Sequence, residues 1–110
     1  MRFWRGTAVI DRVLAQIGAF PPEIAISAFM DVGNYDAARA FEAVKVPIVA
    51  VNGDLFPTNF EANRRHAPQF DALIMKGVGH FPMLEDPARF GALLDEALRK
   101  VEGAAPNRTR

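Results

Sequence analysis

Two short apolar runs constrain the fold of this 110-residue chain more than any other feature. The run PIVAVN, residues 47–52, is too short for a buried helix and is bounded by turn residues, which is typical of a strand covered on both faces. The run FDALIM, residues 70–75, is predicted to be a second strand. Helix-like segments follow each run, so the order strand, helix, strand, helix predicts an α/β fold with two parallel strands and a right-handed crossover.

Three helices are predicted ahead of the first strand, within residues 1–44. Apolar side chains recur at helical spacing over 7–19, and a second helix is expected to run from the prolines at 21–22 to about residue 33. The apolar face of this second helix is wide, which predicts that it is mostly buried. A short third helix is expected over 35–44.

The helices around the second strand have clear starting signals. Thr58 and Glu61 stand three residues apart, which indicates a capping box at the start of the crossover helix. Asp86 is expected to cap the last helix, with Pro87 in its first turn. The apolar stripe of this last helix comprises Phe90, Leu93, Leu94, Ala97, Leu98 and Val101. Residues 103–110 are expected to form a flexible tail.

Composition narrows the classes of partner. Thirteen basic residues balance thirteen acidic ones, which disfavours binding to nucleic acid or to a membrane surface. Cysteine is absent, which excludes disulfides and thiolate metal sites, and His66 and His80 alone are too few to hold a metal ion. No cofactor is predicted. The first residues lack the apolar segment of a signal peptide, so a cytoplasmic location is expected.

The turns that follow the two strands carry the candidate chemistry. In an open parallel sheet, ligands bind beyond the carboxyl ends of the strands, where NGDLFP places Asp54 and KGVGHFP places His80. Adjacent strands are about 4.8 Å apart, so these two side chains can approach each other. A carboxylate beside an imidazole orients the ring and stabilises its cation, as a catalytic base requires. The alternative is structural: Asp54 as a turn former and His80 as a packed or solvated loop side chain.

The same segments resemble the C-terminal part of the α/β-hydrolase family. VPIVAVNGD resembles the penultimate strand and its acid-bearing turn, GVGHFPMLEDPARF resembles the loop of the catalytic histidine, and LLDEALRKV resembles the terminal helix. The resemblance covers 45–102, and residues 1–44 resemble the end of a helical cap region. It implies a partial α/β-hydrolase fold, hydrolysis of a small ester, amide or related substrate, and His80 as the triad histidine.

The chain departs from the pattern of this family at the acid and at the nucleophile. In many members the acid lies three positions after the turn glycine, which is Phe56 here, so the acid is either Asp54 or a residue upstream of this chain. Ser27 is the only serine and lacks the flanking glycines of a nucleophile elbow, and Asp31 lacks the preceding strand. The chain is therefore expected to act on a small-molecule substrate only together with a missing N-terminal part.

An alternative from another class is a catalytically silent interaction module. Two strands are few for an independent sheet, and an unpaired strand such as 47–52 is a template for pairing with another chain. This alternative predicts self-association through an exposed sheet edge.

Overall fold

The computed structural model describes residues 7–104, and the expected tail beyond Ala104 lies outside this range. The chain is a mixture of helices and strands, and each segment predicted as a strand is one. The elements in chain order are α1 (Thr7–Gly18), α2 (Pro22–Gly33), α3 (Ala37–Ala43), β1 (Ile48–Gly53), α4 (Phe60–His66), β2 (Phe70–Met75), α5 (Pro82–Glu85) and α6 (Pro87–Ala104).

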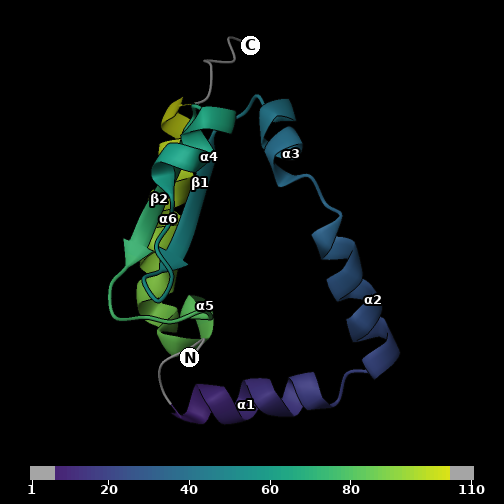
Figure 1. The fold of residues 1–110 in the computed structure, drawn as a ribbon. Coiled ribbons are helices and arrows are strands. Elements are labelled where there is room, and N and C mark those ends of the chain that lie inside the picture. The colour runs from purple at the N-terminus through teal and green to yellow at the C-terminus, as the bar shows by residue number, and fades with distance from the viewer. Residues whose placement is uncertain (1–6, 105–110) are drawn as a thin grey trace, which may run out of the picture.

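The two strands form a two-stranded parallel sheet, as predicted. Ile48 pairs with Phe70 at one end of the register and Gly53 pairs with Met75 at the other. The crossover helix α4 packs on β2, and α6 packs along both strands, so the sheet lies between the two helices (Figure 1). The predicted α/β class is therefore confirmed at the level of strand order and direction.

An aromatic cluster fixes α3 and α4 to one face of the sheet. Phe70 is buried in β2, and its ring centroid lies 6.1 Å from that of Phe41 in α3 and 6.0 Å from that of Phe60 in α4. Ala67 and Ala72 complete this buried cluster. Aromatic rings at these separations and tilted angles attract one another beyond the area they bury. Through this cluster α3 packs against the α/β unit, although α3 precedes β1 in the chain.

The start of α6 follows the sequence prediction closely. The Oδ1 atom of Asp86 accepts a hydrogen bond from the backbone N–H of Arg89 at 3.1 Å, and the helix begins at Pro87. Ala97 is buried, whereas Leu94 and Leu98 are exposed, so the buried stripe is narrower than predicted. The helix extends to Ala104, two residues past the predicted boundary at 102.

The predicted capping box at Thr58 and Glu61 is wrong. The helix α4 begins at Phe60, and its cap is Asn59, whose Oδ1 accepts a hydrogen bond from the backbone N–H of Ala62 at 2.9 Å. The hydroxyl oxygen of Thr58 instead accepts a hydrogen bond from the side-chain amide of Asn52 at 2.9 Å. Asparagine caps a helix at least as well as threonine does. The cap is therefore one residue later than predicted, and the side chain of Thr58 pairs with Asn52 in β1 instead.

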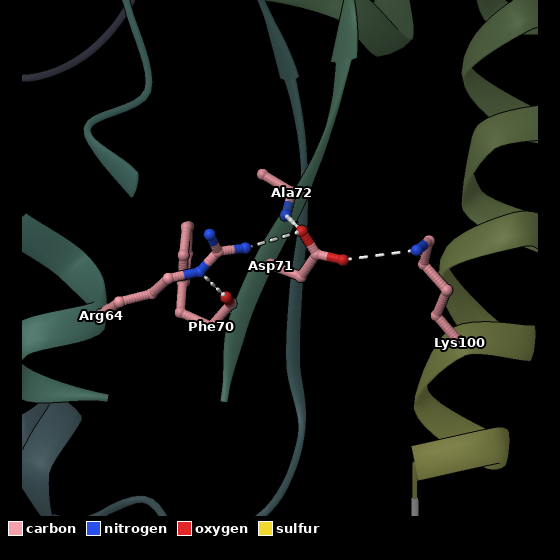
Figure 2. Close-up of polar contacts among 5 residues, drawn as sticks. All are labelled: Arg64, Phe70, Asp71, Ala72 and Lys100. Atoms are coloured by element: carbon pink, nitrogen blue, oxygen red, sulfur yellow. Dashed lines mark hydrogen bonds and ion pairs between the residues drawn. The ribbon is translucent and has the colours of Figure 1, made fainter. Parts of the chain in front are cut away.

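A surface ion-pair network joins the helices on the two sides of the sheet through Asp71 (Figure 2). The Oδ1 atom of Asp71 lies 3.3 Å from a guanidinium nitrogen of Arg64 in α4, and its Oδ2 atom lies 3.3 Å from Nζ of Lys100 in α6. The backbone N–H of Ala72, donating to Oδ1, is the main cause that lowers the pKa of Asp71 below its ordinary value of 3.8. Lys100 and Arg64 add to this effect, while partial burial opposes it.

We expect Asp71→Asn to lower the free energy of unfolding at neutral pH by up to about 1 kcal/mol, the usual range for exposed pairs. Because the folded-state pKa is lowered, this contribution is present above 3.8 and is lost as the pH falls through the folded-state pKa. Urea denaturation at neutral and acidic pH measures the change. Asp95→Asn, on the exposed surface of α6, is the matched control. An unchanged acid dependence in Asp71→Asn would contradict this role.

The helices α1 and α2 form a helical arm, residues 7–34, that extends away from the sheet (Figure 1). No described residue of α2 is buried, so the prediction that this helix is mostly buried is wrong. The reason is that no described helix or strand packs along its apolar face. Within residues 7–104 no single helix is long and apolar enough to cross a membrane; α1 from Ala8 and α2 pass together by length and composition, with a 102° bend between them.

Candidate active site

The loops that follow β1 and β2 cross in close contact at the carboxyl ends of the two strands. Gly53 lies against the second loop, where a Cβ atom at this position would collide with the backbone oxygens of Val78 and Gly79. The backbone N–H of Asp54 donates to the carbonyl oxygen of Val78 at 3.0 Å. Only a residue without a side chain allows the two loops to approach this closely.

Asp54 connects the first loop to the loop that carries the histidine. Its Oδ2 atom accepts a hydrogen bond from the backbone N–H of Gly77 at 3.0 Å. Gly77 has φ of 77°, a left-handed conformation that glycine adopts without strain, and this turn redirects the chain after β2. One oxygen of Asp54 therefore positions the loop three residues ahead of His80.

His80 is exposed at the end of this loop, between two aromatic rings. Its ring centroid lies 4.9 Å from that of Phe81 and 6.5 Å from that of Phe56, with interplanar angles of 81° and 84°. Edge-to-face contacts of this kind are favourable and restrict the orientation of a ring.

The residue that sequence reasoning missed is Glu85, in the unpredicted short helix α5. Its Oε2 atom accepts a hydrogen bond from the backbone N–H of Gly79 at 2.9 Å, directly before His80. The histidine loop is thus held by two carboxylates, Asp54 at its start and Glu85 near its end. A signal for α5 was present, because Pro82 suits the first turn of a helix and Glu85 lies three residues later.

A cleft of about 510 Å³ opens beside His80 at the carboxyl ends of the strands. Polar groups reach it from β1, from the loop before α4 and from α4 itself, and they include the hydrogen-bonded pair Asn52 and Thr58. Apolar side chains reach it from both loops. Asp54 is absent from its lining as far as residues 7–104 define it. The lining consists of Val51, Asn52, Gly53, Leu55, Phe56, Pro57, Thr58, Asn59, Asn63, Gly79, His80, Pro82 and Met83.

The other candidate residues lie elsewhere. Ser27 and Asp31 are in α2, an ordinary helix of the arm, and neither follows a strand as an elbow nucleophile does. His66 is at the end of α4, where its Nδ1 atom lies 2.9 Å from Oε1 of Glu42 in α3. In the part of the chain that the structure describes, no three histidine, aspartate or glutamate side chains are grouped to hold a metal ion.

The arrangement places an accessible imidazole on a loop held at both ends, beside a cleft with polar and apolar walls. Such a group can accept and return a proton for a molecule bound in the cleft. No family model matches this chain, and no curated protein or solved structure is significantly similar to it. Its fold class therefore rests on the observed strand pairing, and its chemistry rests on the geometry of the cleft.

Proposed function

We propose that this chain is the C-terminal segment of an α/β-hydrolase that cleaves a small ester, amide or related substrate. The observation that carries the proposal is the position of His80, which lines a cleft at the carboxyl ends of two parallel strands. The nucleophile comes from a separate N-terminal part with the strand-to-helix elbow. Substrate conversion therefore requires both parts.

In this proposal His80 is the general base and then the general acid. Its imidazole takes the proton of the attacking nucleophile and returns it to the leaving group, so that no net proton is lost from the site. The hydrogen bonds from Gly77 to Asp54 and from Gly79 to Glu85 hold the loop before substrate arrives. A preorganised base needs little rearrangement during the reaction, which favours catalysis.

Phe56 marks the departure of this chain from the family pattern at the triad acid. Many members of the family carry the triad acid three positions after the turn glycine, and Phe56 occupies that position relative to Gly53. Its ring meets the ring of His80 edge-on, with the centroids 6.5 Å apart. The residue that stands where the triad acid usually lies is thus next to the proposed base, but it is a phenylalanine and cannot ionise.

Two candidates for the triad acid follow from this departure. Asp54 is one residue after Gly53, and its Oδ2 atom accepts a hydrogen bond from the backbone N–H of Gly77 in the histidine loop. The other candidate is an acid in the upstream part of the enzyme. Either residue would orient the imidazole of His80 and stabilise its cation.

The proposal is tested by supplying the upstream part. The chain alone is expected to remain unlabelled by a serine-directed fluorophosphonate probe, since Ser27 is in a plain helix. A polypeptide with the first strands and the Gly-x-Ser-x-Gly elbow, fused ahead of residue 1, is expected to create hydrolysis of p-nitrophenyl acetate. The same fusion with the elbow serine replaced by alanine is the control. Labelling of the isolated chain, or a folded fusion without activity, would contradict the proposal.

A second candidate function is favoured by the two-stranded sheet. Since β1 pairs only with β2 among residues 7–104, each strand has one edge without a partner strand. Such an edge can accept a strand from another chain, so the segment would serve as an interaction module. Amide hydrogen exchange tests this function, because edge pairing protects β1 amides more strongly in concentrated than in dilute samples. Protection independent of concentration would contradict it.

A further inference from the structure

The cleft beside His80 is lined by uncharged side chains. Apart from His80 itself, none of the described residues that line it is ionisable. Asp54 and Glu85, the carboxylates that hold the histidine loop, are absent from this lining. A charged group placed in the cleft therefore loses hydration without meeting a carboxylate, ammonium or guanidinium group of the described lining.

The basic side chains of α4 are not part of this lining. Asn63 lines the cleft, whereas Arg64, the next residue, donates from Nε to the carbonyl oxygen of Phe70 at 2.8 Å. The same guanidinium group pairs with Asp71 (Figure 2). Arg65 is also absent from the lining that the described residues form. The helix thus presents a carboxamide to the cleft, and its guanidinium groups lie outside it.

Two polar side chains of the lining have hydrogen-bonding capacity that no described residue uses. The side-chain amide of Asn63 is half-buried and has no hydrogen-bond partner among the described residues. The hydroxyl oxygen of Thr58 accepts from Asn52, and its hydrogen can still donate. Because a carboxamide both donates and accepts, these groups fit the neutral polar part of an ester or amide.

Apolar side chains from the first loop and from α5 form the rest of the lining. Phe56 and Met83 are each 42% exposed, so a bound molecule can cover part of both. Covering them removes apolar surface from water, which favours a ligand with an apolar group. Sites for small molecules have volumes of about 300 to 1,000 Å³ and combine apolar walls with a few polar groups. The cleft, at about 510 Å³, is within this range.

Resting on the proposed hydrolase function, we infer that the cleft selects an uncharged ester or amide whose acyl group is apolar. The acyl group lies against Phe56 and Met83, and the polar part of the substrate bonds to Asn63 and Thr58. All four residues line the same cleft as His80, so a substrate held in this way is beside the proposed base. Asn63 then determines specificity, because its amide satisfies a neutral partner and offers no charge to an ionic one.

Binding of four matched probes to the full chain tests this selection. Phenylacetamide is neutral, phenylacetate is its anionic analogue, phenethylammonium is its cationic analogue, and acetamide lacks the ring. Each is titrated in mildly alkaline solution, above the pH range in which histidine usually titrates, and NMR follows the side-chain amide signals of Asn63. Phenylacetamide is expected to shift these signals. The two charged probes should bind at least about tenfold more weakly, and acetamide likewise at least about tenfold more weakly.

Asn63→Asp reverses the expected preference. The substitution keeps the shape of the side chain and adds a negative charge, so the affinity for phenethylammonium should rise about fivefold. The affinity for phenylacetamide should fall about fivefold, because a donor is lost. Gln16→Glu makes the same chemical change on the exposed surface of α1, outside the cleft, and is expected to change neither affinity. Unchanged NMR signals of β2 show that each variant keeps its fold.

The outcomes separate this inference from the proposed hydrolase function. Equal binding of the charged and neutral probes, or phenylacetamide that leaves the Asn63 signals unshifted, would overturn the inference, and neither result depends on a variant. If the fusion hydrolyses p-nitrophenyl acetate but phenylacetamide does not bind, the inference is wrong and the proposed function stands. If phenylacetamide binds selectively and the folded fusion is inactive, the uncharged binding site stands and the hydrolase function is wrong.

Discussion

Replacement of His80 by alanine is expected to lower the hydrolysis rate of the reconstituted enzyme by at least about a thousandfold, the size of effect seen when a catalytic triad loses one member. His80 lies exposed on its loop and lines the cleft, so the substitution removes the proposed base without opening a cavity in the core. The free energy of unfolding should therefore stay within about 0.5 kcal/mol of that of the unchanged chain. Initial rates with p-nitrophenyl acetate and urea denaturation measure the two quantities.

The other histidine of the chain is the matched control. His66 pairs with Glu42 between α4 and α3 and is absent from the cleft lining given by the described residues. His66→Ala should thus keep the hydrolysis rate within a few-fold of that of the unchanged fusion. It should lower the free energy of unfolding only slightly, since an exposed ion pair contributes about 0 to 1 kcal/mol. Equal activity of His80→Ala and the unchanged fusion would remove His80 from the mechanism.

Asp54→Asn separates the two candidate acids in the same fusion. If Asp54→Asn lowers the hydrolysis rate as much as His80→Ala does, Asp54 is the triad acid, because an amide cannot stabilise the imidazolium. If the hydrolysis rate falls by less than about tenfold, the triad acid lies in the upstream part. Asparagine keeps a side-chain oxygen that can accept from the N–H of Gly77, so the loop contact survives the substitution.

Gly53→Ala is expected to lower the free energy of unfolding by about 3 kcal/mol, the upper range for an overpacked site. The added Cβ atom would lie 2.5 Å from the carbonyl oxygen of Val78 and would also collide with that of Gly79. Both are backbone atoms, so relief requires the strand ends to separate and the histidine loop to move. Urea denaturation measures the loss, and chemical shifts of the amides of Gly77 and Gly79 report the movement.

A second glycine provides the opposite expectation. Gly91 is inside α6, and a Cβ atom there meets nothing within 4 Å. Gly91→Ala should raise the free energy of unfolding by about 0.5 to 1 kcal/mol, since alanine favours a helix interior over glycine. If Gly53→Ala is as stable as the unchanged chain, the two loops do not make the close approach described above.

Local patterns in the sequence were sufficient to predict most of the regular structure. The strand from Phe70 to Met75 matches its predicted bounds, and Asp86 caps α6 as its position before Pro87 indicates. These features depend on neighbours within a few residues, which a sequence pattern records directly. The parallel direction of the strands also followed from element order, because a crossover helix separates them.

Predictions that required knowledge of distant partners were less successful. Thr58 was expected to cap α4, but its hydroxyl pairs with Asn52, a competition that helix signals alone do not reveal. Glu85 was not assigned to the histidine loop, because its contact with Gly79 depends on the short helix α5. A wide apolar face predicted that α2 is buried, yet burial requires a packing partner, and the described chain supplies none.

The sequence by itself determined the element order, the parallel strands and the placement of Asp54 and His80 after the two strand ends, since these follow from periodicity and turn chemistry. Only the tertiary structure decided how the two loops meet. The close approach at Gly53 and the carboxylate contacts of Asp54 and Glu85 join residues from separate loops. The exposure of α2 was also a tertiary outcome, because burial depends on which surfaces meet in space.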